Sequence, residues 1–154
     1  MKDKRGSAIM LLGFLFILSF FLFSLIILDH MILKTNMERA KDAIDGALLA
    51  GLEKVNQEAL SYNVIEFDKA AVQATFTSYL QDNIAGICTA PPVIEEFAVY
   101  NREDLPTICS RGFTVNEPSV HLVMRVILNR PVLGGLLGEN YSFRVHLDFG
   151  NSLE

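Results

Sequence analysis

The sequence predicts an α+β protein: a long N-terminal helix, a second helix, and then a small antiparallel sheet. Three observations support this class: an uncharged apolar run at the start, helical spacing of apolar residues after it, and two-residue alternation near the end. Helices followed by strands are typical of α+β proteins. The chain has 154 residues, of which 126 follow residue 28. That length is enough for one modest hydrophobic core.

The uncharged run covers residues 7–28, SAIMLLGFLFILSFFLFSLIIL. A helix needs about 20 mostly apolar residues, at about 1.5 Å each, to cross a bilayer. A cleaved signal peptide is the alternative, but its apolar region has about 7–15 residues and ends in a small-x-small site. Here the run leads into Asp29 and His30 without an Ala-x-Ala pattern. We therefore expect a retained transmembrane helix over residues 7–28.

The charges around the span predict its orientation. A basic cytoplasmic leader, residues 1–6, contains Lys2, Lys4 and Arg5, and the positive-inside rule then places residues 29–154 outside the cytoplasm as a head. The head holds all but Asp3 of the 18 acidic residues and all but three of the 13 basic ones, a net charge of −7. Nucleic acid is not expected as a partner of such an acidic head.

The first helix is expected to run on as an amphipathic continuation, residues 29–60, because no proline interrupts it and apolar residues recur at helical spacing. One stripe of this continuation is rich in small residues, which let another backbone approach closely. Two interpretations stay open: the stripe seats the head's own sheet or second helix, or it packs against a helix of a neighbouring subunit. We call this stripe the small-residue face: Ala40, Ala43, Ala47, Ala50 and Gly51.

A second helix is predicted from about residue 66 to residue 84, with Gly86 as its C-terminal stop. One of its faces, at helical spacing, is expected to contain Phe67, Ala70, Ala71, Ala74 and Ser78. Three strands follow, at residues 97–99, 120–128 and 141–149. The last strand alternates apolar and polar residues, so one of its faces is buried and the other is solvated. The last two strands are expected to pair antiparallel through residues 129–140, which contain proline and three glycines.

Cys88 and Cys109 both lie in the head. Disulfides persist outside the cytoplasm, and this pairing closes a loop of about 22 residues, for a stabilisation of roughly 3 kcal/mol. We therefore predict a disulfide between them. Two unpaired thiols are the alternative, because the sequence does not give the distance between the Cα atoms.

Histidine and serine side chains are the candidates for catalysis and metal binding. His121 and His146 fall on the last two strands, where they are expected to share a face with Arg125, Arg144 and Asp148. This face is either a weak metal or acid–base cluster or, as we expect, a solvated polar face, because no HExxH-like spacing accompanies it. Ser110 has no Gly-x-Ser-x-Gly motif and no ordered His and Asp around it. The sequence therefore predicts no catalytic residue, no metal site, no cofactor and no small-molecule substrate.

Asp29 lies where the span ends. A carboxylate there either extends into the membrane interface or pairs with a positive group of a partner helix.

Three stretches of the chain resemble type IV pilin-like proteins, and more narrowly the TadE/TadG-like minor pseudopilins of tight-adherence pilus systems. They are Arg5-Gly6-Ser7-Ala8, the run from Ile26 to His30 followed by Asn36-Met37 and the alanine-rich residues 40–51, and the closing unit at residues 120–149. The resemblance implies a pilin-like fold and cleavage between Gly6 and Ser7 by a prepilin peptidase. Type IV pilins carry a glutamate at the fifth position after the cleaved glycine, and here that position is Leu11, so processing stays open.

The predicted function is structural: a membrane-anchored minor pilin or pseudopilin that works by helix packing and by contacts of its head. The implied partners are the membrane, other pilin subunits and an assembly platform. The alternatives are a signal-anchored binding module unrelated to pili and, third, an anchored enzyme.

Overall fold

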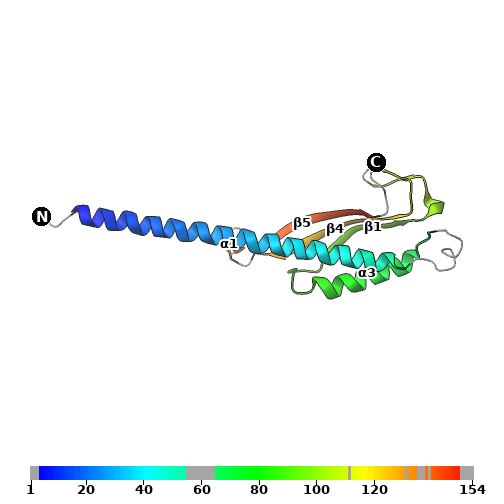
Figure 1. Cartoon of the computed structure of the whole chain (residues 1–154), viewed down its shortest axis with the longest axis horizontal. Helices are drawn as coiled ribbons and strands as arrows, with labels where there is room; N and C mark the ends of the chain where they lie inside the picture. The colour runs from blue at the N-terminus through cyan, green and yellow to red at the C-terminus, as the bar shows by residue number, and fades with distance from the viewer. Residues whose placement is uncertain are drawn as a thin grey trace.

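The computed structural model describes residues 4–54, 65–110, 112–130, 132–134, 138 and 140–149. A long helix carries a head of helix and sheet along its C-terminal half (Figure 1). The α+β class predicted from the sequence is confirmed. The elements in chain order are α1 (Lys4–Leu52), α3 (Lys69–Ile84), β1 (Val93–Tyr100), η1 (Arg102–Asp104), β2 (Thr107–Ile108), β3 (Thr114–Val115), β4 (Ser119–Asn129) and β5 (Asn140–Phe149).

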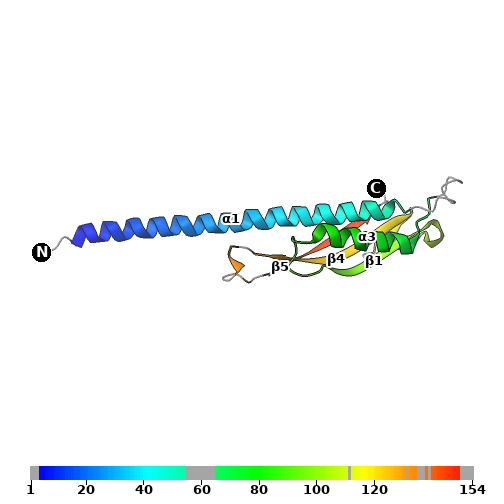
Figure 2. The ribbon, with the colours of Figure 1, turned by 90° about the horizontal axis from the view of Figure 1, so that it is seen from below.

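Helix α1 is continuous over 49 residues, which corresponds to about 74 Å at 1.5 Å per residue. Within the described residues it alone is long and apolar enough to anchor in a membrane, and a signal sequence has the same character. Its most apolar stretch has a mean hydropathy of 2.9, and none of that stretch is buried inside the protein. Both views show this half of α1 projecting away from the head (Figures 1 and 2).

Helix α1 ends at Leu52, earlier than the predicted end near residue 60. Glu53 and Lys54 are not helical, while residues 55–60 lie outside the described part of the chain. The Asp68 N–H donates to the Lys54 carbonyl oxygen at 3.2 Å, so the chain returns to α1 at this point. Local helix propensity favoured continuation, but packing α3 back against α1 requires the helix to stop here.

Helix α3 starts at Lys69, three residues later than predicted, because Asp68 is its N-cap. The Asp68 carboxylate accepts from the N–H groups of Ala70 at 3.1 Å and Ala71 at 3.0 Å. The predicted end is confirmed at Ile84, followed by Gly86 at φ +81°. Of the face predicted for this helix, Phe67 precedes α3 and packs partly buried against the core. Ala70, Ala74 and Ser78 are exposed, because larger apolar side chains bury more area. The buried residues of α3 are Val72, Phe76, Leu80 and Ile84.

The main sheet has three antiparallel strands in the order β1–β4–β5. The predicted pairing of the last two strands is confirmed, with Val123 opposite His146 and Arg125 opposite Arg144. Helices α1 and α3 cover one face of this sheet (Figure 2), and alternate residues of β4 fill the space between the layers. These fully buried β4 residues are Val120, Leu122, Met124, Val126 and Leu128.

Candidate functional site

The structure divides the small-residue face into an internal and an outer part. Ala40 and Ala47 are fully buried in the core of the head. Gly51 lies against α3 so closely that a Cβ atom there would come within 3.1 Å of the Val72 carbonyl oxygen. These three residues therefore seat the head's own second helix and sheet, which is the first of the two interpretations, and they are not available to a neighbouring subunit.

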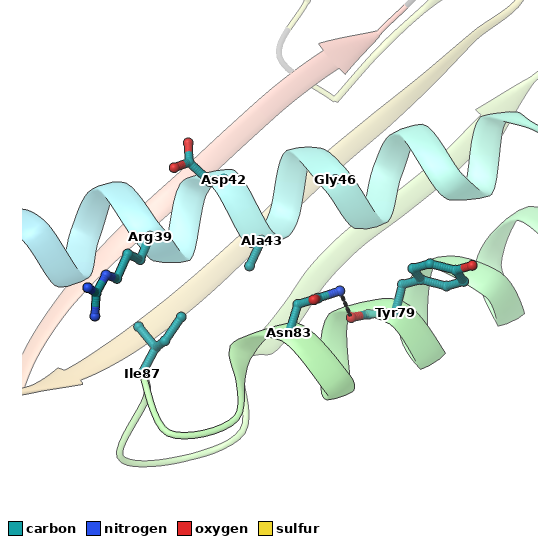
Figure 3. Close-up of a pocket in the computed structure, with 7 residues that line it drawn as sticks. All are labelled: Arg39, Asp42, Ala43, Gly46, Tyr79, Asn83 and Ile87. Carbon is teal, nitrogen blue, oxygen red and sulfur yellow. Dashed lines mark hydrogen bonds between the residues drawn. The ribbon is translucent and has the colours of Figure 1, made fainter.

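Ala43, in the outer part of the face, lines a groove between α1 and α3 with a volume of about 510 Å³. Ala43 and Ala50 are half-buried, and Gly46 is exposed with nothing within 4 Å of an added Cβ. Figure 3 shows Ala43 on the α1 side of the groove and Tyr79 and Asn83 on the α3 side, where the Asn83 amide donates to the Tyr79 carbonyl at 2.8 Å. The residues lining the groove are Arg39, Asp42, Ala43, Gly46, Tyr79, Asn83 and Ile87.

Asp29 makes a contact that neither of the two expectations for it included. Its side chain is buried, with 4% of the residue exposed, and its Oδ1 accepts from the backbone N–H groups of Leu133 at 3.1 Å and Val132 at 3.3 Å. Both donors belong to the connection between β4 and β5. The carboxylate therefore holds the tip of this hairpin against α1, directly beyond the uncharged run.

The predicted disulfide does not form: Cys88 and Cys109 are both free. Cys88 pairs with Leu128 near the end of β4, whereas Cys109 precedes Ser110, which contacts His121 near the start of β4. At about 3.3 Å per strand residue, His121 and Leu128 are roughly 23 Å apart, and a disulfide needs Cα atoms within about 7 Å. Burial raises the pKa of the Cys88 thiol.

A cluster of histidine and acidic side chains lies on the sheet face that the helices leave uncovered. His121 on β4 lies opposite Asp148 on β5. His146 lies two residues before Asp148 on β5 and on the same face of the sheet. His121 Nδ1 is 2.5 Å from Asp148 Oδ1 and 3.4 Å from His146 Nε2. His146 Nε2 is 3.3 Å from Asp148 Oδ2. The prediction that His121, His146 and Asp148 share one face is confirmed.

The expectation that this face is solvated was wrong for His121, whose side chain is only 2% exposed. Ser110, in the turn between β2 and β3, lies over it with Oγ 3.3 Å from His121 Nε2. Glu96 on β1 contributes an Oε2 that is 3.5 Å from the same nitrogen and accepts from the Ser110 hydroxyl at 2.5 Å. We call these five residues the His121 cluster: Glu96, Ser110, His121, His146 and Asp148.

Ser110, His121 and Asp148 are thus in contact, contrary to the expectation that Ser110 has no His and Asp around it. Their order matches the Ser–His–Asp arrangement of hydrolases, but the proton of Ser110 is directed to Glu96 rather than to His121. The neighbouring N–H groups of Cys109 and Gly112 donate to the carbonyls of Phe113 and Cys109, at 2.9 and 2.8 Å. They are therefore engaged within the turn and do not offer an oxyanion hole.

Acidic groups dominate the electrostatics around this end of the sheet. Burial, and after it the negative charge of Glu96, raise the pKa of Tyr100. Next to the cluster, hydrogen bonds from Arg125 and Arg144 hold the pKa of Glu95 below its usual value. These two arginines therefore neutralise Glu95, and the carboxylates of Glu96 and Asp148 face the histidines.

Gly6 and Ser7 lie in the first turns of α1, and cleavage between them stays a prediction. No family model, curated protein or solved structure matches this chain.

Proposed function

We propose that this chain is a membrane-anchored structural subunit, of the minor pilin or pseudopilin type, in a pilus or secretion-type assembly. The observation that carries the proposal is the continuity of α1. The uncharged run ends at Leu28, and the next residue, Asp29, is already buried against the head. The anchor and the core of the head are therefore parts of one helix, without a linker between them.

This continuity has a mechanical consequence. Ile44 and Leu48 of α1 are fully buried in the head, so any tilt of the apolar half is transmitted to the whole head. An anchored enzyme or binding module needs only a flexible tether to stay at a membrane. A rigid connection is useful when the lateral packing of apolar helices must set the position of each head, as it does in a filament.

The proposed orientation follows the leader charges: an N-terminus on the cytoplasmic side and the head outside. Val132 and Leu133, between β4 and β5, both donate to Asp29 directly after the uncharged run, so they lie at the end of the head next to the apolar half of α1. In this orientation the hairpin rests at the membrane surface, where the Asp29 carboxylate holds it. Partners are then the membrane, other subunits, an assembly platform and, if Gly6 is processed, a prepilin peptidase.

We further propose that the chain is not an enzyme, since the hydroxyl of Ser110 is bonded to Glu96. Two described N–H groups of its turn, those of Cys109 and Gly112, are already bonded to carbonyl oxygens. A signal-anchored binding module is the competing function, and the experiment below separates it from a subunit.

The test is to insert Gly-Ser-Gly-Ser between Leu28 and Asp29. The insertion leaves the apolar run and every head contact intact but breaks the rigid connection. The matched control carries the same insertion between Asn116 and Glu117, two exposed residues of the head. Both variants are expected to stay in the membrane fraction.

Only the insertion after Leu28 is expected to abolish co-purification with partner subunits and recovery in sheared surface filaments. Assembly that survives this insertion would contradict the proposal and favour a tethered binding module. Sequencing of the mature N-terminus is an independent check, because a start at Ser7 is expected of a processed subunit.

A further inference from the structure

Three potential metal-binding atoms face one another in the His121 cluster. His121 Nδ1, His146 Nε2 and a carboxylate oxygen of Asp148 all lie within 4.8 Å of one another. A tetrahedral Zn²⁺ ion with bonds of about 2.0–2.1 Å has neighbouring ligand atoms about 3.3 Å apart. The separations from His146 Nε2 to His121 Nδ1 and to Asp148 Oδ2 are 3.4 and 3.3 Å. We propose that these three side chains bind a divalent transition-metal ion, with Zn²⁺ as the ion that fits best.

The third separation, 2.5 Å between His121 Nδ1 and Asp148 Oδ1, is that of a short hydrogen bond. A metal ion takes the place of the shared proton, and the two ligand atoms must then move apart by less than about 1 Å. Asp148 has room for this movement because its side chain is 31% exposed.

The partners of the other His121 nitrogen favour this role. The Ser110 hydroxyl gives its proton to Glu96, so His121 Nε2 meets the oxygen of Ser110 at 3.3 Å and that of Glu96 at 3.5 Å, both as acceptors. Nε2 therefore carries a proton, which leaves the Nδ1 lone pair of the neutral ring for a metal. A carboxylate that accepts from the far nitrogen of a histidine ligand is the usual support of a zinc-bound imidazole.

The location of the three ligands makes the site rigid and accessible. His121 on β4 and His146 and Asp148 on β5 are held in register by the antiparallel ladder. His121 is 2% exposed, whereas the side chains of His146 and Asp148 are 20% and 31% exposed. The ion thus reaches the site from the solvent side, where a water molecule completes the coordination.

The donor set decides which ions to expect. Two imidazoles and one carboxylate suit Zn²⁺ and its neighbours in the first transition series, whereas Mg²⁺ and Ca²⁺ prefer oxygen ligands throughout. The nearby negative charges of Glu96 and Asp148 attract any cation, so selectivity for Zn²⁺ over Mg²⁺ separates coordination by the histidines from simple electrostatic attraction.

The test is calorimetric titration of the full-length, untagged protein in detergent micelles with ZnCl₂ and, separately, with MgCl₂. One equivalent of Zn²⁺ is expected to bind, with no measurable binding of Mg²⁺. Titration with Co²⁺ is expected to produce the visible absorption of a four-coordinate ion. The variants His146→Gln and Asp148→Asn are expected to weaken Zn²⁺ binding more than about 100-fold, and Glu96→Gln about 10- to 100-fold.

The matched control is His30→Gln, because His30 is an exposed histidine on α1, far along the chain from the cluster. It is expected to bind Zn²⁺ like the unaltered protein. His121 itself is left unchanged, since it is buried and its replacement endangers the fold. Absence of Zn²⁺ binding, or unchanged binding in His146→Gln and Asp148→Asn, would overturn the proposal and leave the cluster as a hydrogen-bonded network.

Discussion

Replacing Asp29 with alanine tests whether this carboxylate holds the β4–β5 hairpin on α1. The substitution removes the acceptor of two backbone N–H groups, those of Leu133 at 3.1 Å and Val132 at 3.3 Å. A buried donor left without a partner costs about 1–3 kcal/mol. Leu133 is buried and bears this cost in full, whereas Val132 is half-buried and its bond is long. The expected loss of stability is therefore about 2–4 kcal/mol.

Asp29→Asn separates the hydrogen bonds from the charge. The amide oxygen still accepts, but hydrogen bonds to a charged group are about twice as strong as neutral ones, so the expected loss is only about 1 kcal/mol. The measurement is thermal unfolding of the full-length protein in detergent, followed by circular dichroism. At about 2–4 °C per kcal/mol for a chain of this size, the Tm falls by about 4–16 °C in Asp29→Ala and about 2–4 °C in Asp29→Asn.

The control is Asp45→Ala, since Asp45 is an exposed carboxylate on the same helix. Hydrogen exchange supplies a local readout, because the amides of Val132 and Leu133 are expected to lose protection in Asp29→Ala and to keep it in Asp45→Ala. Equal melting temperatures and unchanged exchange in the two variants would refute the role assigned to Asp29.

Two further predictions concern α1 and the surface charges. Ala47→Leu is expected to lower the stability by about 1–3 kcal/mol because it overpacks a fully buried position. Gly46→Ala, at an exposed position next to the small-residue face, is expected to raise the stability by up to about 1 kcal/mol, because nothing lies within 4 Å of an added Cβ. A reversed order of the two Tm values would contradict the burial of Ala47 in the core of the head. Lys69 donates to Asp104 at 2.7 Å and holds the pKa of this carboxyl below its ordinary value of 3.8. The stability that the ion pair contributes is present above the pKa of Asp104 in the unfolded state. It is lost as the pH falls through the lower pKa of Asp104 in the folded state. The free energies of unfolding of the wild type and Asp104→Asn, measured by urea denaturation, are expected to differ by up to about 1 kcal/mol at neutral pH and to converge on acidification. A difference that does not change with pH would contradict the assignment.

Features that depend on near neighbours in the chain could be predicted from the sequence. The uncharged run, the glycine after the second helix and the alternation of the last strand all have local physical causes. Residues 140–149 pair with β4 as predicted, because alternation and a short connection leave a hairpin as the simplest arrangement. The start of α3 is the exception among local features, since its N-cap is Asp68, a residue type that favours N-cap positions and thus a local signal for a start at Lys69.

Features that join distant parts of the chain could not be predicted in the same way. His121 was placed on the correct face, but the turn that buries it contributes Ser110 from outside both strands of the hairpin. Cys88 lies beside the end of β4 and Cys109 near its start. The number of residues between two cysteines in the chain does not determine the distance between them in the fold.

The sequence alone determined the class of the fold, the apolar half of α1, the second helix and the antiparallel hairpin, because hydrophobicity and periodicity act over a few residues. The tertiary structure alone decided that Ala47 faces the core, that Asp29 binds a backbone segment more than 100 residues away, and that the five members of the His121 cluster converge. The physical reason is that these contacts arise from how the layers stack and which turn covers which face. That arrangement is selected by the packing of the whole chain.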